Sequence, residues 1–129
     1  MTSINSFRDL IVWQVSMDLA NVCFDIVEAI PHPYRFTFSN QLIPAGLSVP
    51  SNIAEGSRRP TKAYLNHLSY SLGSHAEIET ILELIRRRKL VPEELLAGGL
   101  QLTEPIGKML HGRVASLELH MQRDHGWHT

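Results

Sequence analysis

The sequence predicts an all-α fold, an antiparallel up-down-up-down four-helix bundle. Four segments repeat apolar residues at the spacing of a helix, and no segment alternates polar and apolar residues as a strand would. Links of only a few residues join these segments, which favours antiparallel neighbours. The length of 129 residues fits one domain, which we expect to span 1–129 with an ordered core at about 7–121 and a frayed tail at 122–129.

The first segment, from about Asp9 to Ile30, has its polar residues on one narrow stripe. The rest of its surface carries two apolar seams, one made of Trp13, Met17, Ala20, Phe24 and Val27 and the other of Val12, Leu19, Cys23, Ile26 and Ile30. A helix of a monomeric bundle buries one seam, so we expect the second seam to pack against another subunit. We assign this oligomer interface to Val12, Leu19, Cys23 and Ile26. A wide core stripe within one chain is the alternative.

Prolines delimit and interrupt the second segment. Pro31 and Pro33 end the first helix, because proline lacks an amide hydrogen and disfavours helix in the residue before it. The second helix then runs from about 38 to 56 and contains Pro44 and Pro50. Because Pro50 removes a helical donor, we expect the second helix to be kinked there.

The third helix ends on a basic run, and a short link joins it to the fourth helix. The third helix runs from about 60 to 90, and its last turn holds the basic run 86–89, where positive charge suits the helix dipole. Pro92 opens the fourth helix. The glycines at 98–99 and Pro105 predict irregularity in the first half of that helix.

Composition excludes several classes of protein. The chain is 43% apolar and 19% charged, which excludes a disordered protein. Its formal net charge of −1 gives no overall attraction to nucleic acid or membrane, so any such binding needs local clusters of charge. The single cysteine, Cys23, forms no internal disulfide, which is typical of a reducing compartment and predicts a cytoplasmic location. No apolar run is long enough to span a bilayer.

Four motifs identify a resemblance. They are Phe7-Arg8-Asp9-Leu10 with Trp13-Gln14, Ser48-Val49-Pro50-Ser51-Asn52-Ile53-Ala54-Glu55-Gly56, Gly73-Ser74-His75-Ala76-Glu77-Ile78-Glu79-Thr80, and Ile106-Gly107-Lys108-Met109-Leu110. From Phe7 to about Leu119, the chain resembles the bacterial four-helix-bundle proteins encoded in intervening sequences of large-subunit ribosomal RNA genes. The second motif is specific, and the four motifs occur in order.

This resemblance implies a small cytoplasmic bundle that assembles as a ring, typically of five, and has no enzymatic activity. A related branch serves diversity-generating retroelements as an accessory protein that binds nucleic acid and a reverse transcriptase. The implied partners are therefore copies of the chain itself and RNA or a nucleoprotein complex, with no membrane and no cofactor. The chain has Ile43-Pro44 where family members commonly carry two arginines, so it lacks part of the nucleic-acid surface that such arginines would form.

Basic residues gather at the two ends of the predicted bundle. One end holds Arg8, Arg58, Arg59, Lys62 and Arg123, and the other holds Arg35, Arg86, Arg87, Arg88 and Lys89. The candidate nucleic-acid-binding residues are Arg58, Arg59, Lys62, Arg86, Arg87, Arg88 and Lys89. The alternative is that these are ordinary solvated helix ends, where cations also suit the helix dipole.

Short links also place positions of different helices at one level of the bundle. Asn52 comes level with His67, and we expect both side chains to be buried and hydrogen-bonded. Glu79 falls on the core stripe of the third helix and is expected to be buried as well. The alternatives are a binding or catalytic pair for Asn52 with His67, and a face turned toward a neighbouring subunit for Glu79.

Motifs for catalysis and metal binding are weak, and no catalytic or metal-ligating residue is assigned. A di-iron bundle needs Glu-x-x-His on two helices, and no glutamate here has a histidine three positions later. HEPN-like helical ribonucleases use an arginine and a histidine a few residues apart, as in Arg113 with His120 and Arg123 with His128. With seven histidines in the chain, such pairs arise by chance.

The sequence thus predicts a non-enzymatic oligomeric bundle that acts as a nucleic-acid-associated accessory or scaffold protein. Two other functions remain open at this point. One is a HEPN-like helical ribonuclease, and the other is a protein–protein interaction module with no nucleic-acid role. An accessory or scaffold protein should shift the electrophoretic mobility of labelled RNA without shortening it, whereas a ribonuclease should shorten it.

Overall fold

Helices account for nearly all of the chain that the structure describes. The computed structural model describes residues 6–127, with side chains for 6–123. A short 3-10 turn, η1 (Phe7–Asp9), precedes four helices: α1 (Ile11–Ala29), α2 (His32–Ser57), α3 (Thr61–Arg88) and α4 (Glu93–Trp127). Residues 6–127 contain no strand, which confirms the predicted all-α fold with four helices. Within this range, each helix is too short or too polar to cross a membrane.

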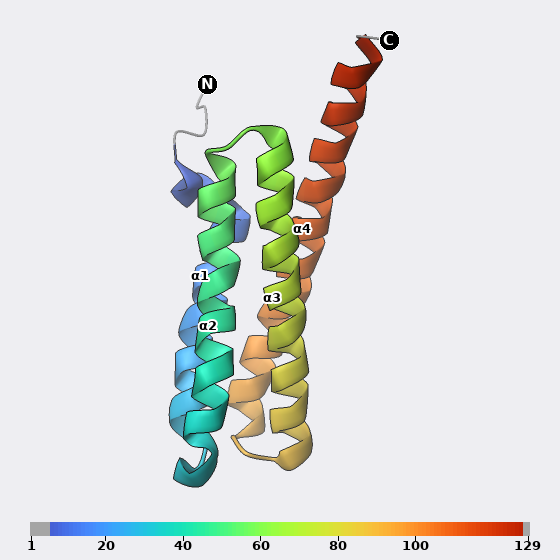
Figure 1. Cartoon of the computed structure of the whole chain (residues 1–129). Helices are drawn as coiled ribbons and strands as arrows, with labels where there is room; N and C mark the ends of the chain where they lie inside the picture. The colour runs from blue at the N-terminus through green and yellow to red at the C-terminus, as the bar shows by residue number, and fades with distance from the viewer. Residues whose placement is uncertain (1–5, 128–129) are drawn as a thin grey trace.

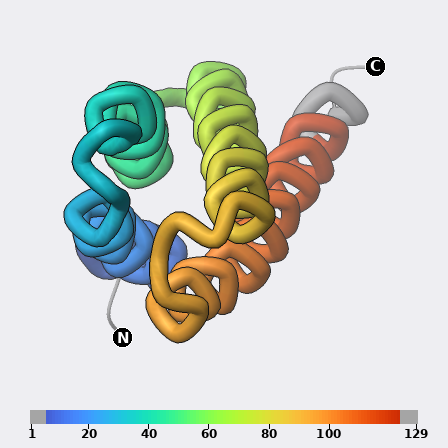
Figure 2. The backbone as a smooth tube through the Cα atoms, turned by 90° about the horizontal axis from the view of Figure 1, so that it is seen from below, coloured from blue at the N-terminus to red at the C-terminus, as the bar shows by residue number. Residues whose placement is uncertain are grey.

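The four helices pack around a common centre. α1 contacts α2 and α4, and α3 contacts the same two helices. Seen along the bundle, α4 slants away from the other helices toward its C-terminal end (Figure 2). The α1–α2 and α3–α4 connections lie at one end of the molecule, which we call the far end (Figure 1). η1 and the α2–α3 connection lie at the other, which we call the η1 end.

The predicted oligomer interface on α1 lies inside the single chain, so this assignment is wrong. Its four residues are each at most 5% exposed and belong to the core: Val12, Leu19, Cys23 and Ile26. The large apolar side chains that this helix leaves exposed include Met17 and Phe24 of the other seam, at 41% and 53%. The physical reason is that α1 is rotated about its own axis relative to the predicted orientation. α2 and α4 flank α1 and turn the Leu19 seam inward.

α2 begins about one and a half turns earlier than predicted. It starts at His32, with Pro31 as its N-cap residue and Pro33 in its first turn. An amide hydrogen in the first turn has no intrahelical partner, so a proline there costs no hydrogen bond. The two prolines that end α1 therefore also open α2.

Pro44 and Pro50 both lie inside α2, which runs through them to Ser57. Beside Pro50, the Ser71 hydroxyl of α3 donates a hydrogen bond to the carbonyl of Val49 at 2.9 Å. Ser71 is itself buried, so this bond ties the two helices together next to the proline.

α4 is continuous where the glycines and Pro105 predicted irregularity. Gly99 shows why a glycine suits this helix. A Cβ there would lie 3.3 Å from the Ile26 Cδ1 of α1 and 3.4 Å from the Leu82 Cδ1 of α3. The missing side chain therefore lets α4 approach both helices, and packing outweighs the low helix propensity of glycine.

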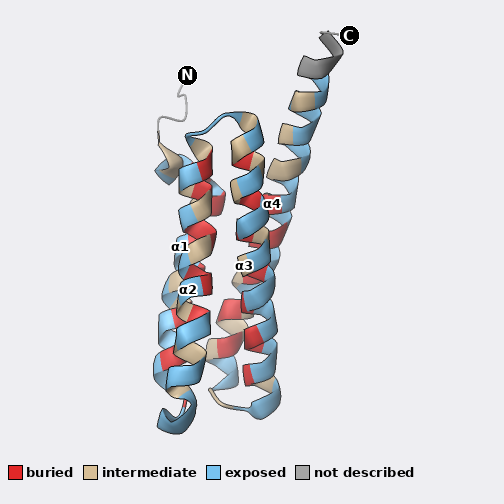
Figure 3. Cartoon of the chain, in the orientation of Figure 1, coloured by how far each residue is buried: buried red, intermediate tan, exposed pale blue. Residues whose placement is uncertain are grey.

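α4 is also the longest helix, and its last turns extend beyond the α2–α3 connection (Figure 1). It continues to Trp127, although the sequence predicted fraying from 122; residues 128–129 of that predicted tail lie outside the described chain. None of the described side chains from 111 to 123 is buried, whereas buried residues line the facing sides of the helices below (Figure 3). The second half of α4 therefore has only part of its surface covered.

Candidate nucleic-acid interface

The η1 end brings together cations from four elements. Arg8 lies in η1, Arg58 and Arg59 follow α2, Lys62 lies in the first turn of α3, and Arg113 comes from α4. No carboxylate among the described residues forms an ion pair with any of these five side chains. Arg123, which the sequence also placed at this end, lies near the C-terminal end of α4.

Phe7 organises two of these arginines. The guanidinium carbon of Arg8 lies 4.6 Å from the centre of the Phe7 ring, and that of Arg58 lies 5.4 Å from it. The ring is held in turn by an edge-on contact with Trp13, with ring centres 5.2 Å apart. Contact with an aromatic face positions a guanidinium without consuming its N–H donors. The two arginines are therefore held in place and keep donors for an anion.

The far end is partly neutralised. Arg86 Nη2 pairs with Glu93 Oε1 at 2.6 Å, and Arg87 Nε pairs with Glu83 Oε1 at 3.3 Å. Arg35, also predicted at this end, donates from Nε to the carbonyl of Ile30 at 3.1 Å. Arg88 and Lys89 have no carboxylate partner in the described part of the chain. Acidic residues of α3 and α4 thus form ion pairs with two of the four residues in the basic run 86–89.

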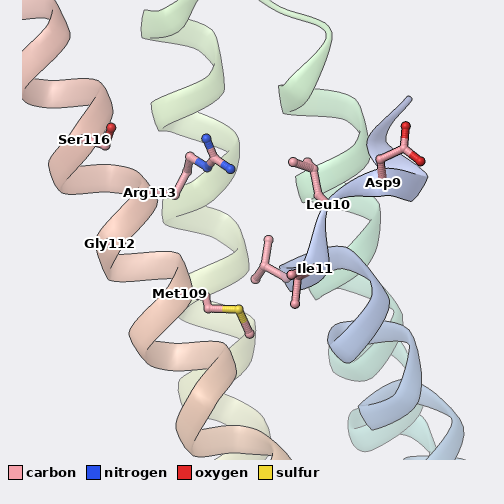
Figure 4. Close-up of a pocket in the computed structure, with 8 residues that line it drawn as sticks. Asp9, Leu10, Ile11, Met109, Gly112, Arg113 and Ser116 are labelled. Carbon is pink, nitrogen blue, oxygen red and sulfur yellow. The ribbon is translucent and has the colours of Figure 1, made fainter. Parts of the chain in front are cut away.

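Arg113 stands out because sequence reasoning did not place it with the other cations. Figure 4 shows its side chain reaching from α4 toward the junction of η1 and α1, while the carboxylate of Asp9 points away from it. A cavity of about 440 Å³ lies between these elements, with Ile11 and Met109 on its walls. The signal that could have found Arg113 is the length of α4, which carries position 113 to the level of η1.

Residues 8–112 match the family model for the 23S rRNA-intervening sequence protein. The chain belongs to this family. The matched region includes the first turn of α4 through Gly112 and stops just before Arg113. A comparison with curated proteins finds no match.

In this 23S rRNA-intervening sequence protein, Asn52 and His67 meet as predicted. Asn52 Oδ1 lies 3.0 Å from His67 Nδ1, across the contact between α2 and α3. The Asn52 amide nitrogen donates to the carbonyl and the hydroxyl of Ser48, at 3.0 and 3.1 Å. Both side chains are half-buried rather than buried, and His67 also lies 3.8 Å from Glu55. With its oxygen and nitrogen both bonded, the amide of Asn52 acts as a register-fixing contact between helices.

Glu79 is not buried, which corrects the prediction. Its side chain is 50% exposed and pairs with His75 Nδ1 at 3.3 Å. The buried polar side chain on this turn is His75, whose Nε2 lies 2.6 Å from the carbonyl oxygen of Thr103 in α4. α3 is rotated so that His75 and Ile78 face inward, which leaves Glu79 at the edge of the core.

The sequence offered two arginine–histidine pairs of the kind that HEPN-like ribonucleases use. Arg113 is turned toward η1 (Figure 4), and His128 of the second pair lies outside the described residues. Among the described residues, no three histidine, cysteine or acidic side chains gather as a metal site would require.

Proposed function

We propose that the chain is a nucleic-acid-associated accessory or scaffold protein that binds RNA, or the RNA of a nucleoprotein complex, through its η1 end. The observation that supports this most is the cluster of five cations there, none of which has a carboxylate partner among the described residues. The family's link to rRNA intervening sequences agrees with an RNA ligand.

The near-neutral net charge does not oppose this proposal. Charges separated by more than a Debye length of about 8 Å are screened at physiological salt, so a phosphate responds to the cations nearest to it. At the η1 end none of these cations pairs with a carboxylate of the described residues, and two of them are held by Phe7. Phosphate contacts of this kind carry no sequence information, so binding should tolerate any RNA sequence.

We propose further that this up-down-up-down bundle, bent in α2 at Pro50, works in the cytoplasm as a ring of about five copies. Exposed apolar side chains support self-association: Met17 and Phe24 on α1, and Leu47 on α2 at 58% exposure. A ring would gather the η1 ends of several chains and raise the local positive charge. The function includes no chemical step.

Binding of labelled single-stranded RNA tests the interface. We expect R58Q/R59Q/K62Q to weaken binding by more than about tenfold and to flatten its dependence on salt between about 50 and 200 mM. The matched control, R87Q/R88Q/K89Q, removes the same charge from the far end and should change the affinity by less than about threefold. Equal effects of the two variants, or no binding at low salt, would contradict the proposal. Shortening of the RNA would contradict the proposal that the protein carries out no chemical step.

Light scattering tests the assembly. The wild-type mass should be about five times the 14.6 kDa of one chain, and M17Q/F24Q should lower it while the helical circular dichroism stays unchanged. A wild-type monomer at micromolar concentration would contradict the ring.

A further inference from the structure

A second cavity at the η1 end has the chemistry of an anion site. Its volume is about 290 Å³, and its walls include Phe7 and Leu10 together with five polar side chains, those of Ser6, Ser57, Arg58, Tyr64 and Arg113. A water molecule takes about 30 Å³ in the liquid, so the cavity holds several waters or a group of phosphate size. No acidic residue is among those that line this cavity, which we call the arginine cavity.

The two arginines enter the arginine cavity from opposite sides of the bundle. Arg58 follows α2 and is steered by its contact with the Phe7 ring, while Arg113 reaches across from α4 (Figure 4). Neither guanidinium has a carboxylate partner in the described part of the chain. A guanidinium presents N–H donors in a planar fork that matches phosphate oxygens. Two such forks provide two positive charges, which match a phosphate monoester, whose charge is close to −2.

Tyr64 contributes the observation that points to a missing ligand. Tyr64 is only 8% exposed, and its buried hydroxyl has no hydrogen-bond partner. Displacing the whole ring toward a partner is opposed by its packing on Gly56, which is so close that a Cβ there would lie 2.8 Å from Tyr64 Cδ1. Burial raises the pKa of this hydroxyl, and the charge of Arg113 opposes the rise only in part. The hydroxyl is therefore a neutral donor at physiological pH.

We propose that the arginine cavity binds one phosphate monoester, held by Arg58, Arg113 and the Tyr64 hydroxyl. Resting on the RNA-binding function proposed above, we assign this group to the terminal phosphate of an RNA. A terminal phosphate monoester has a charge close to −2, which matches the two arginines, whereas an internal phosphodiester carries only one negative charge. The other source of the same chemistry is free phosphate or a nucleotide.

The test compares RNAs of one sequence that end in a 5′-phosphate, a 3′-phosphate or only hydroxyls, together with a calorimetric titration of inorganic phosphate. We expect a phosphorylated end to bind the wild-type chain about tenfold more tightly than a hydroxyl end. This preference should fall about fivefold in Y64F and vanish in R113Q. The matched control, R59Q, removes one charge outside the cavity, so it should weaken all RNAs alike and keep the preference.

Each outcome separates this site from the broader function. RNA binding without preference for a phosphorylated end overturns the assignment to an RNA end and leaves the proposed function standing. Phosphate binding that Y64F and R113Q weaken, without RNA binding, supports the cavity with free phosphate or a nucleotide as its source and overturns the proposed function. No binding of either overturns both. The melting temperature of Y64F without phosphate should not fall, because the lost hydroxyl has no partner in the folded chain.

Discussion

The η1 end and the far end of the bundle both carry clustered cations, but folding treats the two clusters differently. At the far end, Arg86 and Arg87 pair with Glu93 and Glu83. At the η1 end, an aromatic ring rather than a carboxylate holds Arg8 and Arg58. A count of charges along the sequence makes the two ends equivalent, whereas the available positive charge depends on which acids the neighbouring helices bring to each cluster.

This difference has a structural origin. The far-end run ends α3, and α4 begins a few residues later with two acids in its first turn, where negative charge suits the helix dipole. The cations thus face an acidic helix start across a short link. At the η1 end, α3 begins without an acid in its first turn, so no such pairing follows.

The largest predicted effect concerns the packing that supports the η1 end. We expect G56A to lower the free energy of unfolding by about 1–3 kcal/mol, because its Cβ would lie 2.7 Å from His67 Cβ and 2.8 Å from Tyr64 Cδ1. G73A is the control, since a Cβ there meets no atom within 4 Å, and it should stabilise the helix by up to about 1 kcal/mol. Urea denaturation measures both values. Equal stability of the two variants would show that α2 and α3 do not approach closely here.

Removing the two acids that pair with far-end arginines should give the far end unpaired positive charge like that of the η1 end. E83Q/E93Q frees Arg86 and Arg87, so RNA should bind about tenfold more tightly in fluorescence anisotropy at low salt. D18N/E77Q removes the same charge from α1 and α3, at acids that form no ion pair in the described part of the chain, and should change the affinity by less than about threefold. If both pairs raise the affinity equally, net charge rather than ion pairing distinguishes the two ends.

The smallest predicted effect comes from the interior between the two ends. Burial raises the pKa of the Cys23 thiol from its ordinary value of 9.0 to about 12. A raised pKa in the folded chain means that the thiol stabilises folding below pH 9 and that this contribution is lost as the pH rises toward 12. At about pH 9.5 the expected loss is about 0.8 kcal/mol.

Urea denaturation of the wild type and C23A between about pH 8 and pH 9.5 checks this effect, because only the wild type carries the thiol. The native thiol should also resist alkylation, since Cys23 is 0% exposed. Rapid alkylation in the native state, or identical pH dependence of the two proteins, would contradict a dry interior between the ends.

Much of the fold could be predicted from local signals. Helical periodicity identified four helices. The short links predicted that Asn52 and His67 lie at the same level of the bundle, and their side chains are 3.0 Å apart. Both signals depend on distances along the chain that short links preserve. The start of α2 was missed because Pro33 was interpreted as a helix breaker, although a proline in the first turn costs no hydrogen bond.

The candidate site could be predicted only in part. The sequence placed Arg58, Arg59 and Lys62 at one end of the bundle, because they surround a single connection. It did not bring Arg113 to them, since that contact joins α4 to η1 across about a hundred residues of chain. Nor did it show that Tyr64 has a buried hydroxyl without a partner, which depends on the close approach of Gly56.

The sequence by itself determined the helices, which positions of neighbouring helices lie at about the same level, and the grouping of cations near the connections. Only the tertiary structure decided which face of each helix points inward. Periodicity sets the angles between side chains on one helix but not the rotation of that helix against its neighbours. For this reason Leu19 and Cys23 lie in the core while Phe24 is exposed, and Glu79 lies at the edge while His75 is buried.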